Sequence, residues 1–156
     1  MERILITGAL GQLGQEFIKF FNKNNTYVLA TDIRSPLKVL SCDFEIADAM
    51  DEKRIDYLIK KNNINVVYHL VAVLSANGEK NPFMAWEINM KSFQNIINLS
   101  INNGIKKIFW PSSIAVFGTK SNLSFVKQDC ILNPNTIYGI SKLAGERLID
   151  YYNNKF

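Results

Sequence analysis

The sequence predicts an α/β fold in which a parallel β-sheet carries helices on both faces. Short apolar runs alternate along the chain with segments whose apolar residues recur at helical spacing. The runs are continuous rather than interrupted by polar residues, as in strands that are covered on both sides. The chain has 156 residues, of which 47% are hydrophobic and 21% charged. This is the length and composition of one globular domain with a substantial core.

A glycine-rich segment separates the first predicted strand from the first predicted helix. The apolar run Ile4–Ile6 precedes it, and a helical apolar pattern follows from Leu13 to Phe21. We expect Gly8 to permit the turn out of the strand, Gly11 to let the backbone approach a pyrophosphate, and Gly14 to let the helix pack closely on the strand. Because a helix N-terminus attracts anions, the segment is a predicted phosphate-binding turn.

The second predicted strand, Tyr27–Thr31, ends at Asp32. An acidic residue about 20 positions beyond such glycines is where a dinucleotide fold places the acceptor for the ribose hydroxyls. A carboxylate there repels a 2′-phosphate, which favours NAD over NADP. Arg34, two residues further on, would offset that repulsion, so the predicted preference for NAD over NADP is weak.

The remaining elements continue the alternation. They are a short apolar stretch at Val39–Cys42, a helix from about Asp48 to Asn62, a strand over Val66–Val71, a loop over Ser75–Asn81, a long helix from Pro82 to about Asn103, a strand over Lys107–Pro111 and a final helix from about Thr136 to Asn153. Ligands of such sheets bind at the carboxyl ends of the strands. We expect that edge to carry Gly8, Asp32, Asp43, Val71 and Ser112.

Composition argues against several other classes of protein. The net charge is +4 and the isoelectric point is near 9.0, but the basic residues are scattered, so we expect no nucleic-acid partner. No apolar stretch has the length of a membrane span, and the first strand begins at Arg3, without room for a signal peptide. We therefore expect a cytoplasmic protein without a membrane partner. Cys42 and Cys130 stand alone, which predicts reduced thiols and no metal site.

The last predicted helix carries Tyr138 and Lys142, four positions apart and so on one face. A lysine ammonium, and the positive charge of an oxidised nicotinamide, favour the phenolate form of a neighbouring tyrosine. Ser112 and Ser113 follow the preceding strand, and a serine hydroxyl there can hold a reacting oxygen. Because the tyrosine and lysine already supply a base, we expect His69, the one histidine, to be structural.

These motifs resemble those of the extended short-chain dehydrogenases/reductases. "TGALGQLG" is similar to the glycine turn of that family, and Tyr138 to Lys142 match its YxxxK motif. More narrowly, the chain resembles the short-chain type of L-threonine 3-dehydrogenase. The stretches that carry this resemblance, in order along nearly the whole chain, are "YHLVAVLSANGEKNP", "AWEINM", "FWPSSIAVFG" and "NPNTIYGISKLAGE". Nucleotide-sugar epimerases share the fold, the turn and YxxxK, but not "LSANGEKNP" or "FWPSSIAVFG" in this form.

The resemblance implies a Rossmann-type, doubly wound domain over residues 1–156 that binds NAD. The glycine turn would hold the pyrophosphate, Asp32 the adenosine ribose, and Asp43 with Phe44 would border the adenine. Val71 stands where the family commonly has alanine, and should crowd the site slightly. The full set of cofactor residues that the resemblance implies is Gly8, Gly11, Gln12, Leu13, Gly14, Asp32, Ile33, Asp43, Phe44, Leu70, Val71, Ala72, Asn89, Tyr138 and Lys142.

The resemblance also implies the chemistry. Tyr138 would be the base, Lys142 its electrostatic partner, and Ser113 the group that polarises the reacting oxygen, with Ser112 a second candidate. Ser75, Ser113 and Tyr138 would meet the substrate. The implied reaction is oxidation of L-threonine, or a similar secondary alcohol, to 2-amino-3-oxobutyrate with reduction of NAD.

Members of this family continue beyond YxxxK with another strand and a smaller C-terminal region that closes over the substrate. We therefore expect this chain to be the N-terminal part of a longer protein that dimerises through the helices near 82–103 and 136–153. Three functions remain open: a threonine dehydrogenase that needs the missing region, a nucleotide-sugar epimerase or reductase, and a fragment that binds NAD without turnover.

Overall fold

The computed structural model describes residues 1–118, 126–128 and 130–156, which form two compact units. The first unit is built from Met1–Val71 and Ser92–Pro111, and the second from Ala72–Lys91 and Ser112–Phe156. The chain therefore passes between the units after Val71, after Lys91 and after Pro111.

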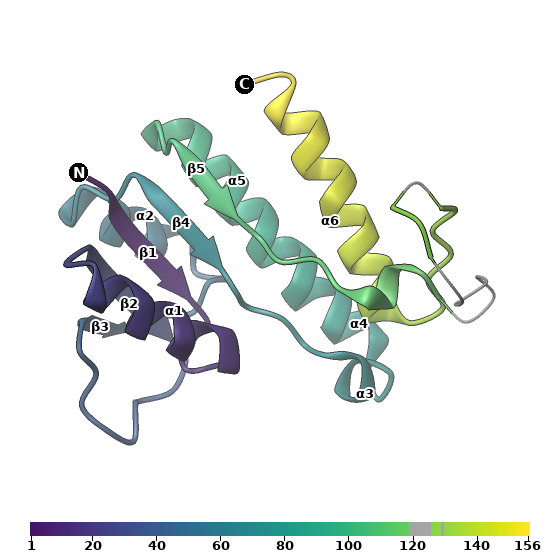
Figure 1. The fold of residues 1–156 in the computed structure, drawn as a ribbon, viewed down its shortest axis with the longest axis horizontal. Coiled ribbons are helices and arrows are strands. Elements are labelled where there is room, and N and C mark those ends of the chain that lie inside the picture. The colour runs from purple at the N-terminus through teal and green to yellow at the C-terminus, as the bar shows by residue number, and fades with distance from the viewer. Residues whose placement is uncertain (119–125, 129) are drawn as a thin grey trace. The chain divides into compact units, whose positions relative to one another are not determined.

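A five-stranded parallel sheet forms the centre of the first unit (Figure 1). Its strand order is β3-β2-β1-β4-β5. The strands are β1 (Arg3–Thr7), β2 (Tyr27–Asp32), β3 (Asp43–Ile46), β4 (Val66–His69) and β5 (Lys107–Phe109). The predicted Rossmann-type parallel sheet is thus confirmed. The strand order reverses between β1 and β4, and the carboxyl ends of strands at such a point form the usual ligand crevice.

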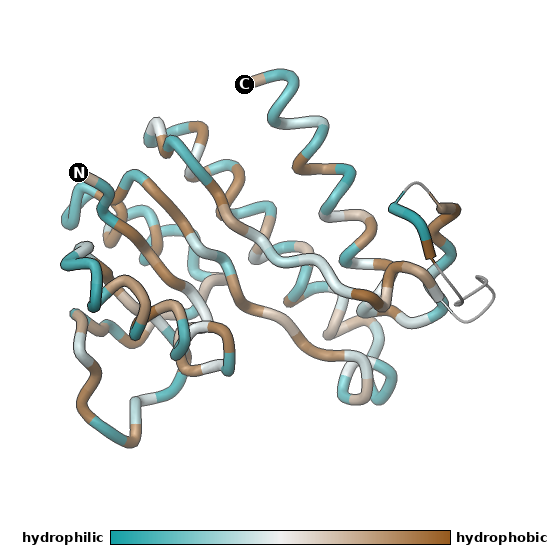
Figure 2. The backbone as a smooth tube through the Cα atoms, viewed as in Figure 1, coloured by the Kyte–Doolittle hydropathy of each residue, from teal (hydrophilic) through white to brown (hydrophobic). Residues whose placement is uncertain are grey.

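Helices cover both faces of this sheet (Figure 1). Helix α1 (Gln12–Lys23) packs Ile18 and Phe21 against one face, together with Ile4 and Ile6 of β1. Helices α2 (Glu52–Lys61) and α5 (Ser92–Asn103) cover the other face, where Leu5, Leu29 and Val67 form a core with Ile55, Leu58, Ile59, Ile96 and Leu99. Figure 2 shows the middle of β1 as a continuous hydrophobic stretch. Such strands fit a sheet that is buried on both sides.

Local sequence signals explain where helix α2 begins and ends. The Asp51 side chain accepts a hydrogen bond of 3.0 Å from the Arg54 backbone N–H, which caps the helix N-terminus. Lys60 and Lys61 lie in the last turn, where cations suit the helix dipole. Asn63, with a φ of 49°, then turns the chain towards β4.

The third strand lies later in the sequence than predicted. Val39–Cys42 is not a strand, and the Val39 side chain is fully exposed (100%). Strand β3 instead starts at Asp43, opposite Leu29, and ends at Ile46, opposite Asp32. The prediction followed apolar residues, but β3 is an edge strand whose position is set by pairing with β2 rather than by hydrophobicity. Asp43 is consequently at the amino end of its strand, and the expectation that it lies at the carboxyl edge is wrong.

The second unit is helical. It contains α3 (Ser75–Gly78), α4 (Pro82–Trp86), the π-helix η1 (Glu87–Lys91), the 3₁₀ turn η2 (Ile114–Val116) and α6 (Ile137–Asn153). The segment Ser75–Asn81, predicted as a loop, therefore includes a short helix. The predicted long helix from Pro82 to Asn103 consists of three parts, because a π-helical turn separates α4 from α5. Thr136 caps α6, since its Oγ1 accepts a hydrogen bond of 3.0 Å from the Gly139 N–H.

In the part of the chain that the structure describes, no helix combines the length and apolarity that crossing a membrane requires. Cys42 and Cys130 are free thiols. Burial raises the pKa of the Cys42 thiol to about 11, with the Asp43 carboxylate adding to the effect. This cysteine therefore stays a neutral, weakly reactive thiol.

Candidate functional site

The glycine turn between β1 and α1 depends on Gly8. Its φ is +69°, a conformation that side chains disfavour, and a Cβ at this position would lie 2.9 Å from the Val71 backbone nitrogen. The turn therefore rests directly on the peptide bond between Leu70 and Val71. Gly11 caps α1, and its N–H donates a hydrogen bond of 3.1 Å to the Gly8 carbonyl oxygen.

Gly14 brings the first turn of α1 against this same loop. A Cβ on Gly14 would lie 2.4 Å from the carbonyl oxygen of Ala9. The sequence predicted a close contact with the strand. The contact is instead with Ala9, a residue of the turn. Gln12 and Leu13, the two residues before Gly14, are exposed and contribute the first N–H groups of the helix, which have no intrahelical acceptor. Open backbone donors at a helix N-terminus fit a pyrophosphate.

Asp32 ends β2 beside this turn, and its side chain is 7% exposed. Its Oδ2 accepts a hydrogen bond of 3.1 Å from the Leu10 N–H. Its Oδ1 accepts bonds from the Arg34 N–H, at 3.2 Å, and from Arg34 Nε, at 3.4 Å. The carboxylate is thereby fixed at the carboxyl edge of the sheet, where the sequence predicted a ribose acceptor.

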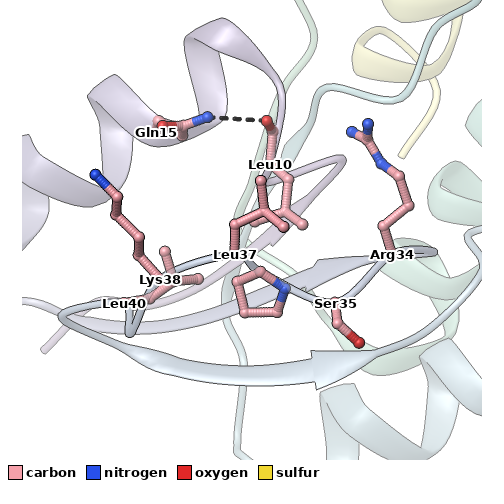
Figure 3. Close-up of a pocket in the computed structure, with 8 residues that line it drawn as sticks. Leu10, Gln15, Arg34, Ser35, Leu37, Lys38 and Leu40 are labelled. Atoms are coloured by element: carbon pink, nitrogen blue, oxygen red, sulfur yellow. Dashed lines mark hydrogen bonds between the residues drawn. The ribbon is translucent and has the colours of Figure 1, made fainter.

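A pocket of about 580 Å³ adjoins the turn and the segment that follows β2 (Figure 3). The residues that line it are Leu10, Gln15, Arg34, Ser35, Pro36, Leu37, Lys38 and Leu40. Gln15 Nε2 donates a hydrogen bond of 3.0 Å to the Leu10 carbonyl oxygen, which Figure 3 shows between α1 and the glycine turn. The apolar side chains and the two basic side chains of this lining suit a ligand with an apolar part and an anionic group. Sequence reasoning did not include Gln15 or the segment 35–40 in the site.

Some of the other predicted cofactor residues of the first unit lie at the carboxyl edge of the sheet, and some do not. Leu70 and Val71 follow β4 at the carboxyl edge, and the exposed Ile33 follows Asp32. Phe44, in contrast, packs against the core beneath α1, and it shares with Asp43 the amino half of β3. The adenine role of these two is therefore not supported by their position.

The segment that does follow β3 is Ala47–Ala49, with Asp48 exposed in its middle. Ala47 N–H donates a hydrogen bond of 3.1 Å to the Asp32 carbonyl oxygen. Sequence reasoning missed this segment because the strand before it was placed too early. The signal in the sequence that could have indicated this segment is Asp48, an acidic residue that follows a strand.

In the second unit, the predicted base and its partner lie on the first two turns of α6. The Lys142 side chain is almost fully buried, and its Nζ lies 5.6 Å from the centre of the Tyr138 ring. Burial lowers the pKa of Lys142 from 10.5 to about 8. At pH 7 the ammonium form still dominates, so a positive charge faces the aromatic ring of Tyr138.

Ser113 is close to the start of α6 because Gly139 has no side chain. A Cβ on Gly139 would lie 2.4 Å from the Ala115 carbonyl oxygen, so η2 packs directly on the first turn of α6. The Ser113 Oγ caps η2 by accepting a hydrogen bond of 3.2 Å from the Ala115 N–H. A hydroxyl that accepts such a bond keeps its own hydrogen available as a donor.

Ser112 is exposed, and its Oγ donates a hydrogen bond to the Glu146 carboxylate of α6. This bond occupies its one hydroxyl hydrogen, which makes Ser113 the better candidate for holding a reacting oxygen. Sequence reasoning missed Glu146, although its position four residues after Lys142 puts both on one helix face.

Asn89 lies in the middle of the π-helix η1 and is buried. Its Oδ1 accepts a hydrogen bond of 2.7 Å from the Val73 N–H, and its Nδ2 donates to the Val73 carbonyl oxygen at 3.1 Å and to Ser141 Oγ at 3.2 Å. Ser141 Oγ in turn donates to the Tyr138 carbonyl oxygen at 2.8 Å. Asn89 thus ties the segment after Ala72 to the helix of Tyr138. Ser141 was not predicted, although it lies within the YxxxK motif.

Ser75, the predicted substrate residue, is the first residue of α3 and half-buried. The segment that it begins is attached to α6, because Glu79 Oε1 accepts a hydrogen bond of 2.8 Å from the Ile137 N–H. Gly78 also faces this residue, since a Cβ there would lie 3.1 Å from Ile137 Cγ2. The segment and the helix of Tyr138 therefore belong to one packed cluster.

Comparison with known proteins is consistent with these features. Residues 4–156 match the family described as the NAD dependent epimerase/dehydratase family. An uncharacterized epimerase/dehydratase of Staphylococcus saprophyticus is 39% identical over 161 residues, covering 100% of this chain and 50% of that protein.

Among solved structures, the GalE-like L-threonine dehydrogenase of Cupriavidus necator, in its holo form, superimposes with a TM-score of 0.94 at 35% identity, over 98% of this chain and 51% of that one. The L-threonine dehydrogenase of Clostridium difficile gives a TM-score of 0.92 at 38% identity, over 100% of this chain and 50% of that one. The UDP-glucose 4-epimerase of Thermotoga maritima shares the fold, with a TM-score of 0.90 at 24% identity, over 99% of this chain and 52% of that one. The chain spans about half the length of each of these relatives.

Proposed function

This chain belongs to the NAD dependent epimerase/dehydratase family, and on that basis we propose that it provides the cofactor-binding and proton-transfer parts of an NAD-dependent L-threonine 3-dehydrogenase. The observation that carries the proposal is the packing of η2 on α6, which brings the Ser113 turn against the helix of Tyr138 and Lys142. The likeness to threonine dehydrogenases at 35% and 38% identity supports the substrate.

The residues of the first unit fit a dinucleotide. The absence of side chains at Gly8 and Gly14 lets the backbone of the turn pack closely on the Leu70–Val71 peptide and on Ala9, which shapes the turn. In the proposal, the N–H groups of Gln12 and Leu13 bind the pyrophosphate at the start of α1. The fixed Asp32 carboxylate accepts from the ribose hydroxyls, because a carboxylate has lone pairs beyond those that Leu10 and Arg34 use. The lining of the neighbouring pocket would then contact the adenosine half.

The residues of the second unit handle the proton. Tyr138, as phenolate, takes the proton from the substrate hydroxyl, and the Lys142 ammonium stabilises that phenolate. Ser113 donates a hydrogen bond to the reacting oxygen and holds it near the phenol. When bound, oxidised nicotinamide supplies the hydride acceptor. Overall, L-threonine loses a proton and a hydride to become 2-amino-3-oxobutyrate, and NAD becomes NADH.

The test is NADH formation, followed by absorbance, with NAD and L-threonine, for this chain beside a version that is extended through its natural C-terminus. We expect NADH to accumulate in the extended version with L-threonine and not with D-threonine. Binding of NAD without NADH production from any alcohol would instead indicate a fragment that binds the cofactor but does not turn over.

A second experiment tests the epimerase function. A nucleotide-sugar epimerase retains its NAD tightly and binds UDP-glucose. Cofactor that co-purifies with the protein, together with UDP-glucose binding in calorimetry, would replace threonine oxidation as the conclusion.

We also propose that the protein is cytoplasmic and dimeric. The free thiols of Cys42 and Cys130 are suited to a reducing compartment. Large apolar side chains on α4 and α6 are exposed to a degree that favours burial against a second copy. They are Phe83, Met84, Trp86, Ile140 and Tyr151.

A further inference from the structure

The one histidine of the chain lies at the centre of a buried hydrogen-bond chain in the first unit. The His69 side chain is 0% exposed. Its Nδ1 lies 2.7 Å from Thr7 Oγ1, and its Nε2 lies 3.1 Å from Ser92 Oγ. Thr7 and Ser92 are also buried. The three side chains join the ends of β1 and β4 to the first residue of α5.

Both hydroxyls can serve the ring in either direction, because a hydroxyl can donate or accept. A neutral imidazole offers one donor and one acceptor, so one hydroxyl donates to the ring while the other accepts from it. A buried network that is satisfied in this way is rigid, and removing one member leaves another polar atom without its bond.

The Thr7–His69–Ser92 hydrogen-bond network adjoins the glycine turn. Thr7 directly precedes Gly8, and His69 directly precedes Leu70. Thr7 and His69 are paired opposite each other in the sheet, and the Leu70 N–H donates a hydrogen bond of 3.0 Å to the Thr7 carbonyl oxygen. Gly8 follows Thr7 on one strand, and Leu70 follows His69 on the other. The close contact between Gly8 and the Leu70–Val71 peptide is therefore adjacent to the Thr7–His69 pair.

Aromatic stacking fixes the plane of the imidazole ring. The His69 and Phe93 rings are 6.1 Å apart and inclined by 15°. Phe93 stacks in turn on Trp110, at 4.7 Å and 22°. Because the ring cannot rotate freely, its two nitrogens point at fixed positions on β1 and α5.

We propose that His69 is a positioning residue for the dinucleotide. Through Thr7 it holds the end of β1 against the end of β4, and so sets the shape of the Gly8 turn that would bind the pyrophosphate. This inference rests on the proposed function only in that the glycine turn holds NAD. It requires neither threonine oxidation nor any substrate.

Four variants test it by separating the two ends of the ring. Thr7→Val keeps the side-chain shape but removes the hydroxyl. His69→Asn keeps a polar atom near the position of Nδ1, facing Thr7, whereas His69→Gln keeps one near Nε2, facing Ser92. Leu58→Ala is the matched control, because it removes core packing at a residue of α2 that belongs neither to the hydrogen-bond chain nor to the ring stack. For each, calorimetry gives the Kd for NAD, corrected for the folded fraction, and urea unfolding gives the stability.

We expect Thr7→Val and His69→Gln to raise the Kd for NAD about tenfold, the effect of one lost buried hydrogen bond. His69→Asn, which keeps the Thr7 contact, should raise it less than about threefold. Leu58→Ala should lower the free energy of unfolding and leave the Kd for NAD close to that of the unmodified chain.

Unchanged Kd values in Thr7→Val and His69→Gln would overturn the inference. So would Kd values that follow the loss of stability through all four variants, since His69 would then be merely structural. NAD binding with this dependence, in an extended version that forms no NADH from L-threonine, would contradict the proposed substrate and leave the inference standing. Absence of NAD binding by the unmodified chain would overturn both.

Discussion

Asp32 is held before any ligand arrives, since the Leu10 N–H, the Arg34 N–H and the Arg34 guanidinium all bond to its carboxylate. The Arg34 side chain is 69% exposed, so this contact between the charged groups is weak. Arg34 can consequently turn towards a phosphate at little cost, whereas Asp32 cannot move. The two residues therefore act in opposite directions on the choice between NAD and NADP.

Asp32→Ala should weaken binding of NAD more than binding of NADP, because the ribose acceptor and the repulsion of a 2′-phosphate disappear together. Arg34→Ala, the matched control, should weaken NADP more than NAD. Calorimetric Kd values for both cofactors measure this. An equal loss for the two cofactors in Asp32→Ala would remove its ribose role.

In a version that is extended through the natural C-terminus, Tyr138→Phe should lose at least about 100-fold in NADH production, the usual contribution of a general base. The Kd for NAD should change less than about twofold, because the ring remains and only the hydroxyl is lost. Steady-state kinetics with L-threonine and calorimetry with NAD check the two parts. Turnover that persists in this variant would mean that another group carries the proton.

Lys142 makes stability depend on pH. Its pKa is about 8 in the folded chain, against 10.5 ordinarily. Between these values the unfolded state binds more protons than the folded state, so stability rises with pH across that window. We expect the free energy of unfolding of the unmodified chain, relative to Lys142→Met, to increase by about 2 kcal/mol from pH 7 to pH 10.

Urea titrations of both proteins across this pH range measure the difference. The control is Lys80→Met, which removes an exposed lysine. Its difference in free energy of unfolding from the unmodified chain should not change with pH. If the difference for Lys142→Met also did not change with pH, the Lys142 ammonium would not be desolvated in the folded chain.

Among the elements, α6 and η2 form the part of the site that depends most on close packing. Gly139 has only a hydrogen where a methyl group would meet the Ala115 carbonyl oxygen at 2.4 Å. Neither atom can be moved without shifting the backbone of η2, which begins directly after Ser113. The spacing between the serine and the tyrosine helix is therefore set by a residue that takes no part in the chemistry.

Gly139→Ala should lower NADH production about tenfold or more, because misplacement of the serine by a fraction of an ångström is costly. It should leave the Kd for NAD nearly unchanged. Arg147→Ala, at an exposed position of α6, is the control and should keep full activity. Full turnover in Gly139→Ala would mean that η2 adjusts without cost.

Elements with strong periodicity could be predicted from the sequence, and elements set by pairing could not. The helix signals around Ile55, Leu58 and Ile59 gave α2 correctly because those residues form the core. Strand β3 was misplaced because its position depends on β2, not on its own composition. The π-helix η1 has no local signal in the sequence, although it carries Asn89.

At the scale of the whole molecule, the alternation of strands and helices was sufficient to predict the parallel sheet and the helices on both faces. It could not reveal that residues 72–91 leave the first unit and pack with residues 112–156. Contacts between segments so distant in sequence have no signal in periodicity. For the same reason the Asn89–Ser141 bond, across 52 positions, was not foreseen.

Dimerisation can be tested on the exposed face of α4. Phe83 is 89% exposed, and Phe83→Glu places a charge where a second copy would pack, so the variant should be monomeric at concentrations where the unmodified protein is dimeric. Sedimentation velocity measures this. Leu37→Glu, also at a fully exposed position but in the first unit, is the control. A monomeric unmodified protein would contradict the proposal.

The interleaving of the two units has a consequence for synthesis and inheritance. The first unit can complete its sheet as soon as β5 has left the ribosome, whereas residues 72–91 emerge early and wait for α6 before their contacts can form. The second unit is therefore the slower to close during translation. Because each unit consists of two separated stretches, a single crossover that transfers one unit whole also transfers part of the other.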